Sequence, residues 1–597
     1  MKALKKQALV ATCTALAVAA SLAAAADTPT PTAAPAWVQE SNRDAMILLQ
    51  VQAKYAPEFA GRTGIDGLDD KISDLNAGVY ERSTQDTEAA LAQLKQKQQT
   101  ATDPNVQQDL DILVSATQRN LDSRALNRKL MLDYIDAAQI EFNGIHFLLD
   151  KQVPPERQKA ALVRLKLYAG DAPGVTPFTV LAQQRTQERF AVDGLTGPYV
   201  EEVKQGIGNT GNYMDGLEQL FKASGLDGWQ DDLAKLKQEN QDYDDWLTKN
   251  LLPRARQDVR PPAAIYADDL KQVGVDEDPQ QLMSQAEFSF TEIQHQMEAL
   301  APQVAKLKGY KSTDYRDVIH ELKKQQITGD RILPFYKKRL AAIEAIIRKE
   351  HIVTLPDRKA SIRLASDAET AQTPAPHMVP PRLIGNTGQY GEFVLPLNLP
   401  PQPGQEAQKF DDFTFDAAGW TLTSHEARPG HELQFASMVE HGVSIARAIF
   451  AFNSANVEGW GLYSEAEMQP YEPLDGQLIT EQLRLQRAAR AFLDPMLNLG
   501  MITPQQARDF MQQEVCLSPA FAKSEVDRYT FILPGQATSY YYGYSKLMSL
   551  RGETEVKLGQ AFNRQKFNDF ILSQGLLPPD LMRKAVDEQF IPSQQKQ

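Results

Sequence analysis

Two histidines separated by a proline and a glycine place the strongest constraint on how this chain can fold. His425 and His431 stand six residues apart in the segment HEARPGH, and Glu426 directly follows the first of them. Six residues give an ideal α-helix a net rotation of about 240°, so an unbroken helix would point the two imidazoles apart. Pro429 removes a helical hydrogen bond, and Gly430 tolerates unusual backbone angles. We therefore expect a bulge or break that lets both histidines face one point.

A histidine pair with an adjacent glutamate is typical of hydrolytic zinc sites. In the familiar helical motif H-E-x-x-H the histidines bind the metal and the glutamate is the general base. Such a site needs a third ligand, usually a carboxylate. The candidates are Glu458 and Glu465 in the segment NVEGWGLYSE at 456–465, and Glu467 just after it. On a helix Glu458 and Glu465 share nearly one face, so Glu458 can bind the metal while Glu465 accepts a hydrogen bond from a ligand histidine. The alternatives are a chance placement of the histidines and solvated carboxylates on an ordinary helix.

Composition limits the kind of metal site and the class of protein. The 597 residues include only two cysteines, Cys13 and Cys516, which excludes a disulfide framework and a thiolate zinc cluster. A tightly held zinc ion must therefore use nitrogen and oxygen ligands, and the two-histidine, one-carboxylate set favours zinc over other divalent metals. The formal net charge of −14 argues against nucleic-acid binding.

The first 26 residues have the pattern of a secretory signal peptide. Three lysines precede an apolar, alanine-rich run that ends with the small residues Ala24 and Ala26. We expect cleavage there, a periplasmic or secreted protein, and a flexible leader rich in proline and threonine at 27–36. The alternatives are an uncleaved membrane anchor or lipidation at Cys13. No later stretch is long and apolar enough to span a bilayer, so no integral membrane segment is expected after cleavage.

Apolar residues recur every three or four positions through most of the chain, which predicts a mainly α fold. The best strand signal is GEFVLPLN at 391–398, which follows a loop rich in proline and glycine from Thr373 to Gly391. A weak boundary near 253–269 predicts an N-terminal helical region, 37–260, and a C-terminal helical region, 261–597, that carries the histidines. The two regions could also form one body.

Three motifs follow one another in an order that resembles a known bacterial family. HEARPGH at 425–431, EGWGLYSE at 458–465 and PGQATSYYYG at 534–543 match the patterns H-E-x-x-P-G-H, E-G-W-x-x-Y and P-G-Q-A-x-x-Y-x-x-G of domain-of-unknown-function family 885. That family is similar to the helical gluzincin metallopeptidases, which include thimet-type oligopeptidases, angiotensin-converting enzyme and thermostable carboxypeptidases. The resemblance implies a large helical body with a deep cleft.

The resemblance also implies roles for individual residues at the metal. His425, His431 and Glu458 map to the three ligands, and Glu426 maps to the general base. The chain departs from the gluzincins by two extra residues between the histidines, and such an insertion shifts Glu426 relative to the metal.

The same resemblance, together with the chemistry of individual side chains, suggests further residues that would contact substrate. Tyr540 would donate its hydroxyl to the oxyanion of a tetrahedral intermediate, with Tyr544 or Tyr529 as alternatives. Arg528 could bind a substrate carboxylate or serve a structural ion pair. Gluzincins bind extended peptides along a strand edge, which the segment 377–398 could supply. Two residues of that segment that could then contact the substrate are Asn386 and Tyr390.

These inferences lead to an exported, zinc-dependent metallopeptidase that hydrolyses short peptides. Carboxypeptidase, dipeptidase and oligopeptidase activities all remain open. One alternative is a metal-dependent amidase or esterase on non-peptide substrates, and another is a non-catalytic metal-binding scaffold. The intact Glu426 argues against the scaffold, because binding zinc does not require it.

Overall fold

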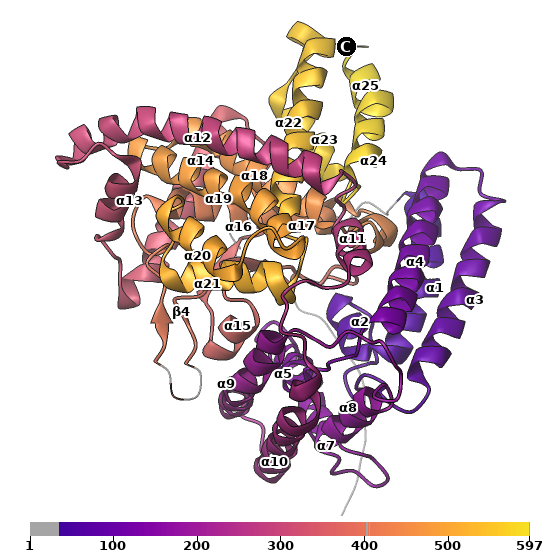
Figure 1. Ribbon diagram of the computed structural model, residues 1–597. Coiled ribbons are helices and arrows are strands. Elements are labelled where there is room, and N and C mark those ends of the chain that lie inside the picture. Colours follow the sequence, from indigo (N-terminus) through magenta and orange to yellow (C-terminus); the bar gives the residue numbers. More distant parts are fainter. Residues whose placement is uncertain (1–34, 402–403, 405, 596–597) are drawn as a thin grey trace, which may run out of the picture. The chain divides into compact units, whose positions relative to one another are not determined.

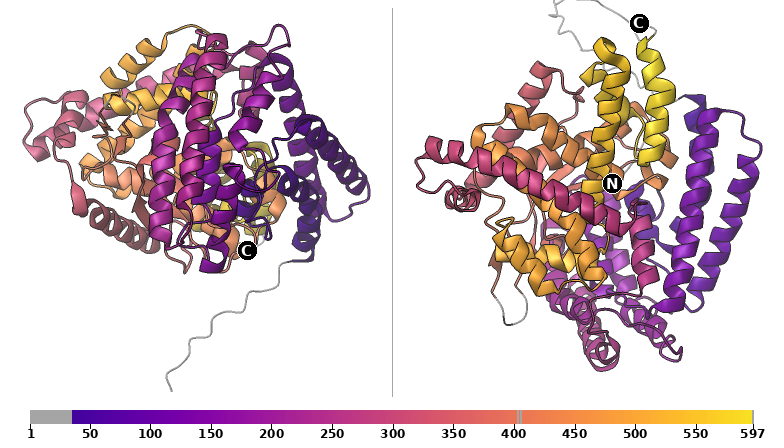
Figure 2. Two further views of the ribbon diagram at one scale, coloured as in Figure 1. Left: turned by 90° about the horizontal axis from the view of Figure 1, so that it is seen from below. Right: turned by 45° about the horizontal axis from the view of Figure 1, so that its top comes forward.

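Helices account for most of the chain, as Figures 1 and 2 show. The structure is a computed structural model that describes residues 35–401, 404 and 406–595. Within these residues the strands are few and short, so the predicted mainly α fold with a small β element is confirmed. The predicted signal peptide, residues 1–26, lies outside the described residues, as does the leader except for its last two residues.

Three long helices at the start of the described chain pack against one another. The last of them begins at Pro104, where the side chain of Asp103 accepts hydrogen bonds from the next free backbone amides and proline fits the first turn. Figure 1 shows these helices in indigo; they are α1 (Ala36–Tyr55), α3 (Val79–Gln98) and α4 (Pro104–Leu130), with the short α2 (Pro57–Thr63) between the first two.

A second group of helices surrounds the pair α5 (Ala137–His146) and α9 (Val200–Ser224). The buried residues of α9 follow the helical spacing, as Val203, Tyr213 and Leu217 illustrate, so one face of the helix enters the core. The other helices of this part are α6 (Pro155–Gln158), α7 (Ala160–Tyr168), α8 (Phe178–Gln187) and α10 (Gln230–Trp246), whereas α11 (Ala263–Gln272) packs against α4.

The C-terminal half is organised around α19 (Leu474–Asn498), whose residues are buried on almost every side. The long α12 (Pro279–Lys308) packs along α19 (Figure 1), and α18 (Ser454–Met468) packs against α22 (Thr538–Leu558). The remaining helices are α13 (Tyr315–Lys323), α14 (Ile332–Glu350), α15 (Asp367–Gln372), α16 (Ala418–Glu426), α17 (His431–His441), α20 (Pro504–Gln513), α21 (Pro519–Asp527), α23 (Arg564–Ser573), α24 (Pro579–Ala585) and α25 (Ile591–Gln595).

Two glycines let α18 and α22 approach each other at backbone distance. A Cβ atom at Gly459 would lie 2.6 Å from the carbonyl carbon of Gly543, and a Cβ at Gly543 would overlap the carbonyl oxygen of Ala455. No other residue could occupy either position without separating the helices. Both glycines belong to the sequence motifs, one to EGWGLYSE and the other to PGQATSYYYG.

A three-stranded sheet lies beside the helices that carry the histidines. Its strands are β1 (Ser361–Leu364), β3 (Glu392–Leu395) and β2 (His377–Val379) in that spatial order, with β1 parallel and β2 antiparallel to β3. The central strand β3 falls within the predicted segment 391–398, and all four of its residues are buried. The outer strand β2 comes from the proline-rich loop. A separate pair consists of β4 (Asn398–Leu399) and β5 (Gln408–Lys409).

The residues from Ala36 onward form one compact unit. Buried polar contacts join early and late parts of this unit: Asp109 of α4 accepts hydrogen bonds from Ser444 at 2.6 Å and from Arg447 at 2.8 Å. The division into two regions near residue 260 stays a prediction. Of the helices in the described residues, none is long and apolar enough to cross a membrane.

The crossing of α18 and α22 predicts opposite effects for two glycine-to-alanine substitutions on one helix. Gly543→Ala forces the backbones apart and should lower the free energy of unfolding by about 1–3 kcal/mol. Gly552→Ala, also in α22, meets no atom within 4 Å and should raise it by about 0.5–1 kcal/mol, because alanine restricts the unfolded chain. Urea denaturation measures the free energy of unfolding of both variants. Equal effects of the two substitutions would contradict a close crossing.

Candidate metal centre

The two histidines lie on consecutive helices, because the helix breaks between them. α16 ends at Glu426 and α17 begins at His431, so the predicted break is confirmed. Gly430 is required there, since a Cβ atom would overlap the carbonyl oxygen of His425. The indole nitrogen of Trp460 donates a hydrogen bond to the carbonyl oxygen of Pro429 at 2.9 Å, which ties the break to α18.

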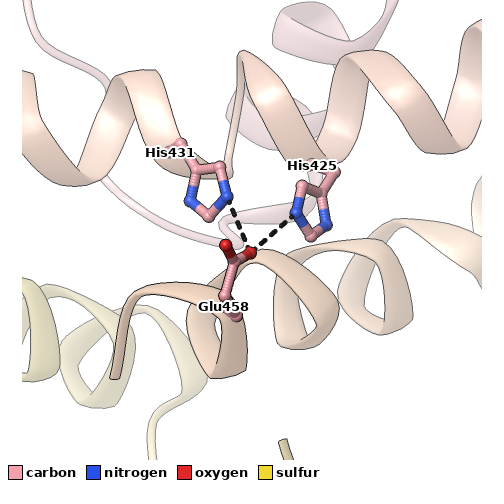
Figure 3. Close-up of side chains that lie close together, drawn as sticks. All are labelled: His425, His431 and Glu458. Carbon is pink, nitrogen blue, oxygen red and sulfur yellow. Dashed lines mark ion pairs between the residues drawn. The ribbon is translucent and has the colours of Figure 1, made fainter. Parts of the chain in front are cut away.

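Glu458 on α18 faces both histidines, as Figure 3 shows. Its Oε2 atom lies 3.4 Å from Nε2 of His425 and 3.3 Å from Nε2 of His431. One potential ligand atom from each of the three residues lies within 4.8 Å of the others. The two histidine side chains are buried and that of Glu458 is 14% exposed. Although burial favours a neutral carboxyl group, the histidines hold the pKa of Glu458 well below its ordinary value.

The spacing of these three side chains fits a small divalent cation. A tetrahedral zinc ion with bonds of about 2.0–2.1 Å to nitrogen and oxygen has ligand atoms about 3.3–3.4 Å apart. The Nδ1 atom of His425 lies 2.6 Å from Oε1 of Glu465, a carboxylate that can only accept, so Nδ1 carries the proton. In the neutral ring Nε2 is then an acceptor that faces the carboxylate of Glu458. Two facing acceptors need a positive charge between them, and two nitrogens with one oxygen are a donor set that suits zinc.

Glu465 is itself held by residues from two other helices. Thr421 of α16 donates to its Oε2 at 2.6 Å, and Arg487 of α19 lies 3.3 Å from its Oε1. Burial alone would raise the pKa of Glu465, but Arg487, His425 and Thr421 together lower it. The structure therefore places an ionised Glu465 beside His425, in position to fix the orientation and protonation of the ring.

Two further residues that support the centre were, like Thr421 and Arg487, not identified from the sequence. Gly461 faces the ring of His425, where a Cβ atom would lie 2.5 Å from Cε1. Gln536 donates from Nε2 to Ser454 at 3.0 Å and to Oε1 of Glu458 at 3.3 Å, and so orients the carboxylate. Both belong to quoted motifs, EGWGLYSE and PGQATSYYYG, but only the fold shows which way their positions face.

A cavity of about 630 Å³ opens onto the cluster. Three residues of the HEARPGH and EGWGLYSE motifs line it, Glu426, His431 and Glu458, together with Arg528 and Tyr540. The rest of its wall is mostly apolar and comes from α2, the 372–383 loop with strand β2, α17, α18 and the segment after α21. A ligand that enters this cavity would meet the cluster directly.

Glu426 and Tyr540 each keep hydrogen-bonding capacity that is not used at this wall. Oε2 of Glu426 is buried and has no hydrogen-bond partner among the described residues. Burial, with a contribution from Glu458, raises the pKa of Glu426 to about 8 in the chain alone. The hydroxyl of Tyr540 accepts a hydrogen bond from Nη1 of Arg528 at 3.3 Å, and its ring centre lies 6.2 Å from that of His425. The phenol proton is thus free to be donated.

The sequence of this chain matches one known protein family. Residues 57–586 match the model of a family described as "Bacterial protein of unknown function (DUF885)". The chain belongs to this family. None of the curated proteins matches it.

Two solved structures share the fold of this DUF885 member. One, described as a lipoprotein of unknown function from Shewanella oneidensis, is 19% identical with a TM-score of 0.69, over 93% of this chain and 100% of that one. The other, described as a lipoprotein from Colwellia psychrerythraea, is 18% identical with a TM-score of 0.74, over 93% of this chain and 99% of that one. At these identities the likeness concerns the fold alone.

Several predicted site residues lie away from the cluster of this DUF885 member. Asn386 donates to carbonyl oxygens of its own loop, and the backbone of Tyr390 is bound by Gln152. Tyr544 lies beside Arg484, at a different cavity. Of the other candidates, Tyr529 donates to Glu525 and Glu467 pairs with Arg551. The structure brings none of these five candidates to the wall of the cavity at the cluster.

A buried ion pair supports the wall that carries Tyr540. Arg490 binds Glu525 through two hydrogen bonds of 2.6 and 2.8 Å, and Tyr529 donates to the same carboxylate at 2.6 Å. Burial opposes the charge on Glu525, but Arg490 and Arg528 lower its pKa to about 2.

This pair predicts a pH-dependent loss of stability. Glu525→Gln leaves Arg490 buried without a counter-charge and should lower the free energy of unfolding by about 3–5 kcal/mol at pH 7. Because the folded-state pKa lies below the ordinary value, the carboxylate stabilises the protein fully above about pH 4.5, and its contribution falls as the pH drops toward 2. Denaturation at pH 7, 5 and 3.5 should show a difference between wild type and variant that is constant at first and then shrinks. A difference that stays constant to pH 3.5 would contradict this assignment.

Proposed function

We propose that the protein is an exported, zinc-dependent peptidase that hydrolyses short peptides. The observation that carries this proposal is the convergence of His425, His431 and Glu458 on one point, beside an unpartnered Glu426, at the wall of a large cavity. A non-catalytic metal site would have no need of that carboxyl group.

The metal would be held by His425, His431 and Glu458. Zinc bound by two histidines and a carboxylate keeps a position open, lowers the pKa of a water molecule there and polarises a carbonyl group. Glu465 holds the proton on Nδ1 of His425, which leaves Nε2 free to act as a ligand. Gln536 donates a hydrogen bond to Oε1 of Glu458, the oxygen that does not face the histidines.

Glu426 and Tyr540 would move protons and stabilise charge. A nearby cation favours the ionised form of Glu426, which can then take a proton from the attacking water and pass it to the leaving amine. Tyr540 lies beside the cluster with its O–H available, so it can donate to the carbonyl oxygen as negative charge develops there.

The cavity supports a peptide of a few residues as the substrate. A volume of about 630 Å³ is in the range that encloses small ligands. Strand β2 is one of the two outer strands of its sheet, and His377 and Met378 line the cavity, so this edge of the sheet can pair with the backbone of an extended peptide.

Export is proposed from two observations. The first 26 residues have the pattern of a signal peptide. The two solved structures with the same fold are described as lipoproteins. Periplasmic or secreted location follows as part of the proposal.

Metal binding can be measured directly on the purified protein. Wild type should bind one zinc ion per chain in calorimetry and elemental analysis. His425→Ala, His431→Ala and Glu458→Gln should each weaken binding by at least about 100-fold, because two ligands hold zinc poorly. His441→Ala is the matched control and should bind as wild type does, since His441 contacts Ser437 instead. Absence of zinc uptake by wild type would refute the proposed centre.

Hydrolysis can be tested with a library of short peptides. Glu426→Gln should keep its zinc and lose activity by about 10²–10⁴-fold, because the proton acceptor is removed while the ligands stay. Tyr540→Phe should lose about 10²-fold in kcat with little change in KM. If the zinc-loaded wild type is as inactive as Glu426→Gln on every peptide, the peptidase assignment is wrong.

A further inference from the structure

Of the three arginines around the ring of Tyr540, Arg528 is the one without a closely paired carboxylate. Three arginines surround the ring of Tyr540, with guanidinium carbons 4.3 to 5.9 Å from its centre. Arg487 lies 3.3 Å from Glu465, and Arg490 binds Glu525 through two hydrogen bonds. Arg528 comes only within 3.8 Å of Glu525, whose oxygens already accept from other donors.

The remaining contacts of Arg528 are weak and neutral. One nitrogen, Nη1, lies 3.3 Å from the hydroxyl of Tyr540 and 3.5 Å from Oε1 of Gln536. The side chain is 17% exposed, so water replaces few of the missing partners. A guanidinium has five N–H donors in a planar fork, and these contacts satisfy it incompletely. Because Arg528 lines the cavity, the natural partner for its free donors is a carboxylate group that enters there.

Gln536 connects this arginine to the metal cluster. Its Nε2 lies 3.3 Å from Oε1 of Glu458, and its Oε1 lies 3.5 Å from Nη1 of Arg528. These two contacts through one amide group keep Arg528 within about 10 Å of the Glu458 carboxylate, which is the reach of about three extended residues. A peptide whose terminal carboxylate binds Arg528 would therefore present one of its last three peptide bonds to the cluster.

The same cavity carries apolar side chains suited to the peptide's own side chains. Four of the large hydrophobic residues that are exposed on the described surface line it: Phe59, Phe452, Ile532 and Leu533. Ile532 ends the helical turn that begins at Arg528, and Leu533 directly follows it. A peptide with an apolar C-terminal residue could place that side chain against these hydrophobic residues and its free carboxylate beside Arg528.

We propose that Arg528, with Tyr540 and Gln536 beside it, binds the C-terminal carboxylate of the substrate. The protein then acts as an exopeptidase that removes one to three residues from the C-terminus and favours apolar residues there. This inference rests on the proposed peptidase function for the cleavage step. The carboxylate site itself can be tested without cleavage.

The binding test uses N-acetyl-Leu-Phe and its C-terminal amide as probes. Zinc-loaded Glu426→Gln protein, which holds the probe without hydrolysis, is titrated with each by calorimetry. The free acid should bind about 10–100-fold more tightly than the amide, the range expected for a charge-assisted pair. Adding Arg528→Gln should abolish this preference, and Arg528→Lys should restore part of it. Arg508→Gln, which removes a positive charge at a separate cavity, is the matched control and should keep the full preference.

A second measurement separates this inference from the peptidase proposal. Wild type should hydrolyse the free acid with a KM at least about 10-fold lower than that of the amide. Equal hydrolysis of both would uphold the peptidase and overturn the role of Arg528. A preference for the acid that depends on Arg528, without any hydrolysis, would uphold the carboxylate site and overturn the peptidase. A preference that survives Arg528→Gln would assign the carboxylate to another cation of the cavity, such as Arg62, and would also overturn the inference.

Discussion

The ring of His425 between two carboxylates is the contact on which the centre depends. Glu465 accepts a hydrogen bond from Nδ1 of His425, and Glu458 faces Nε2 from the same helix. These glutamates stand seven residues apart, with Gly461 between them on the same face of α18. The glycine leaves room for the ring, so the face of α18 is shaped to fit His425.

Several buried charges around this contact depend on one another. Burying one carboxylate is costly unless a positive group lies beside it, and burying an arginine has the same requirement. Here Glu465 lies beside Arg487 and Glu525 beside Arg490, so the wall behind Tyr540 is internally balanced. Glu426, whose Oε2 has no partner among the described residues, and Arg528, which has no closely paired carboxylate, both line the cavity. A ligand that enters the cavity can therefore reach both of them.

The sequence predicted the helical fold and the family, and its motifs led to the residues that converge. Helical periodicity is a local property of the sequence, so the helices could be predicted without a structure. The break at Pro429 and Gly430 could also be predicted, because proline and glycine both interrupt helices. Gln536 and Arg487 could not be assigned, because their contacts join segments that are far apart in the chain. Asn386 stood in the right loop, but the strand that lines the cavity is nearer the start of that loop.

The spacing of the motifs follows from the crossing of α18 and α22. Because Gly459 and Gly543 bring the two backbones together, residues one turn from the crossing must lie close to each other. Glu458 directly precedes the first glycine, and Tyr540 stands three residues before the second, which is almost one helical turn. The glycines therefore position the carboxylate and the phenol against the same cavity. A glutamate and a tyrosine at these spacings from paired glycines are a geometric unit, so both motifs are needed to build this part of the cavity wall.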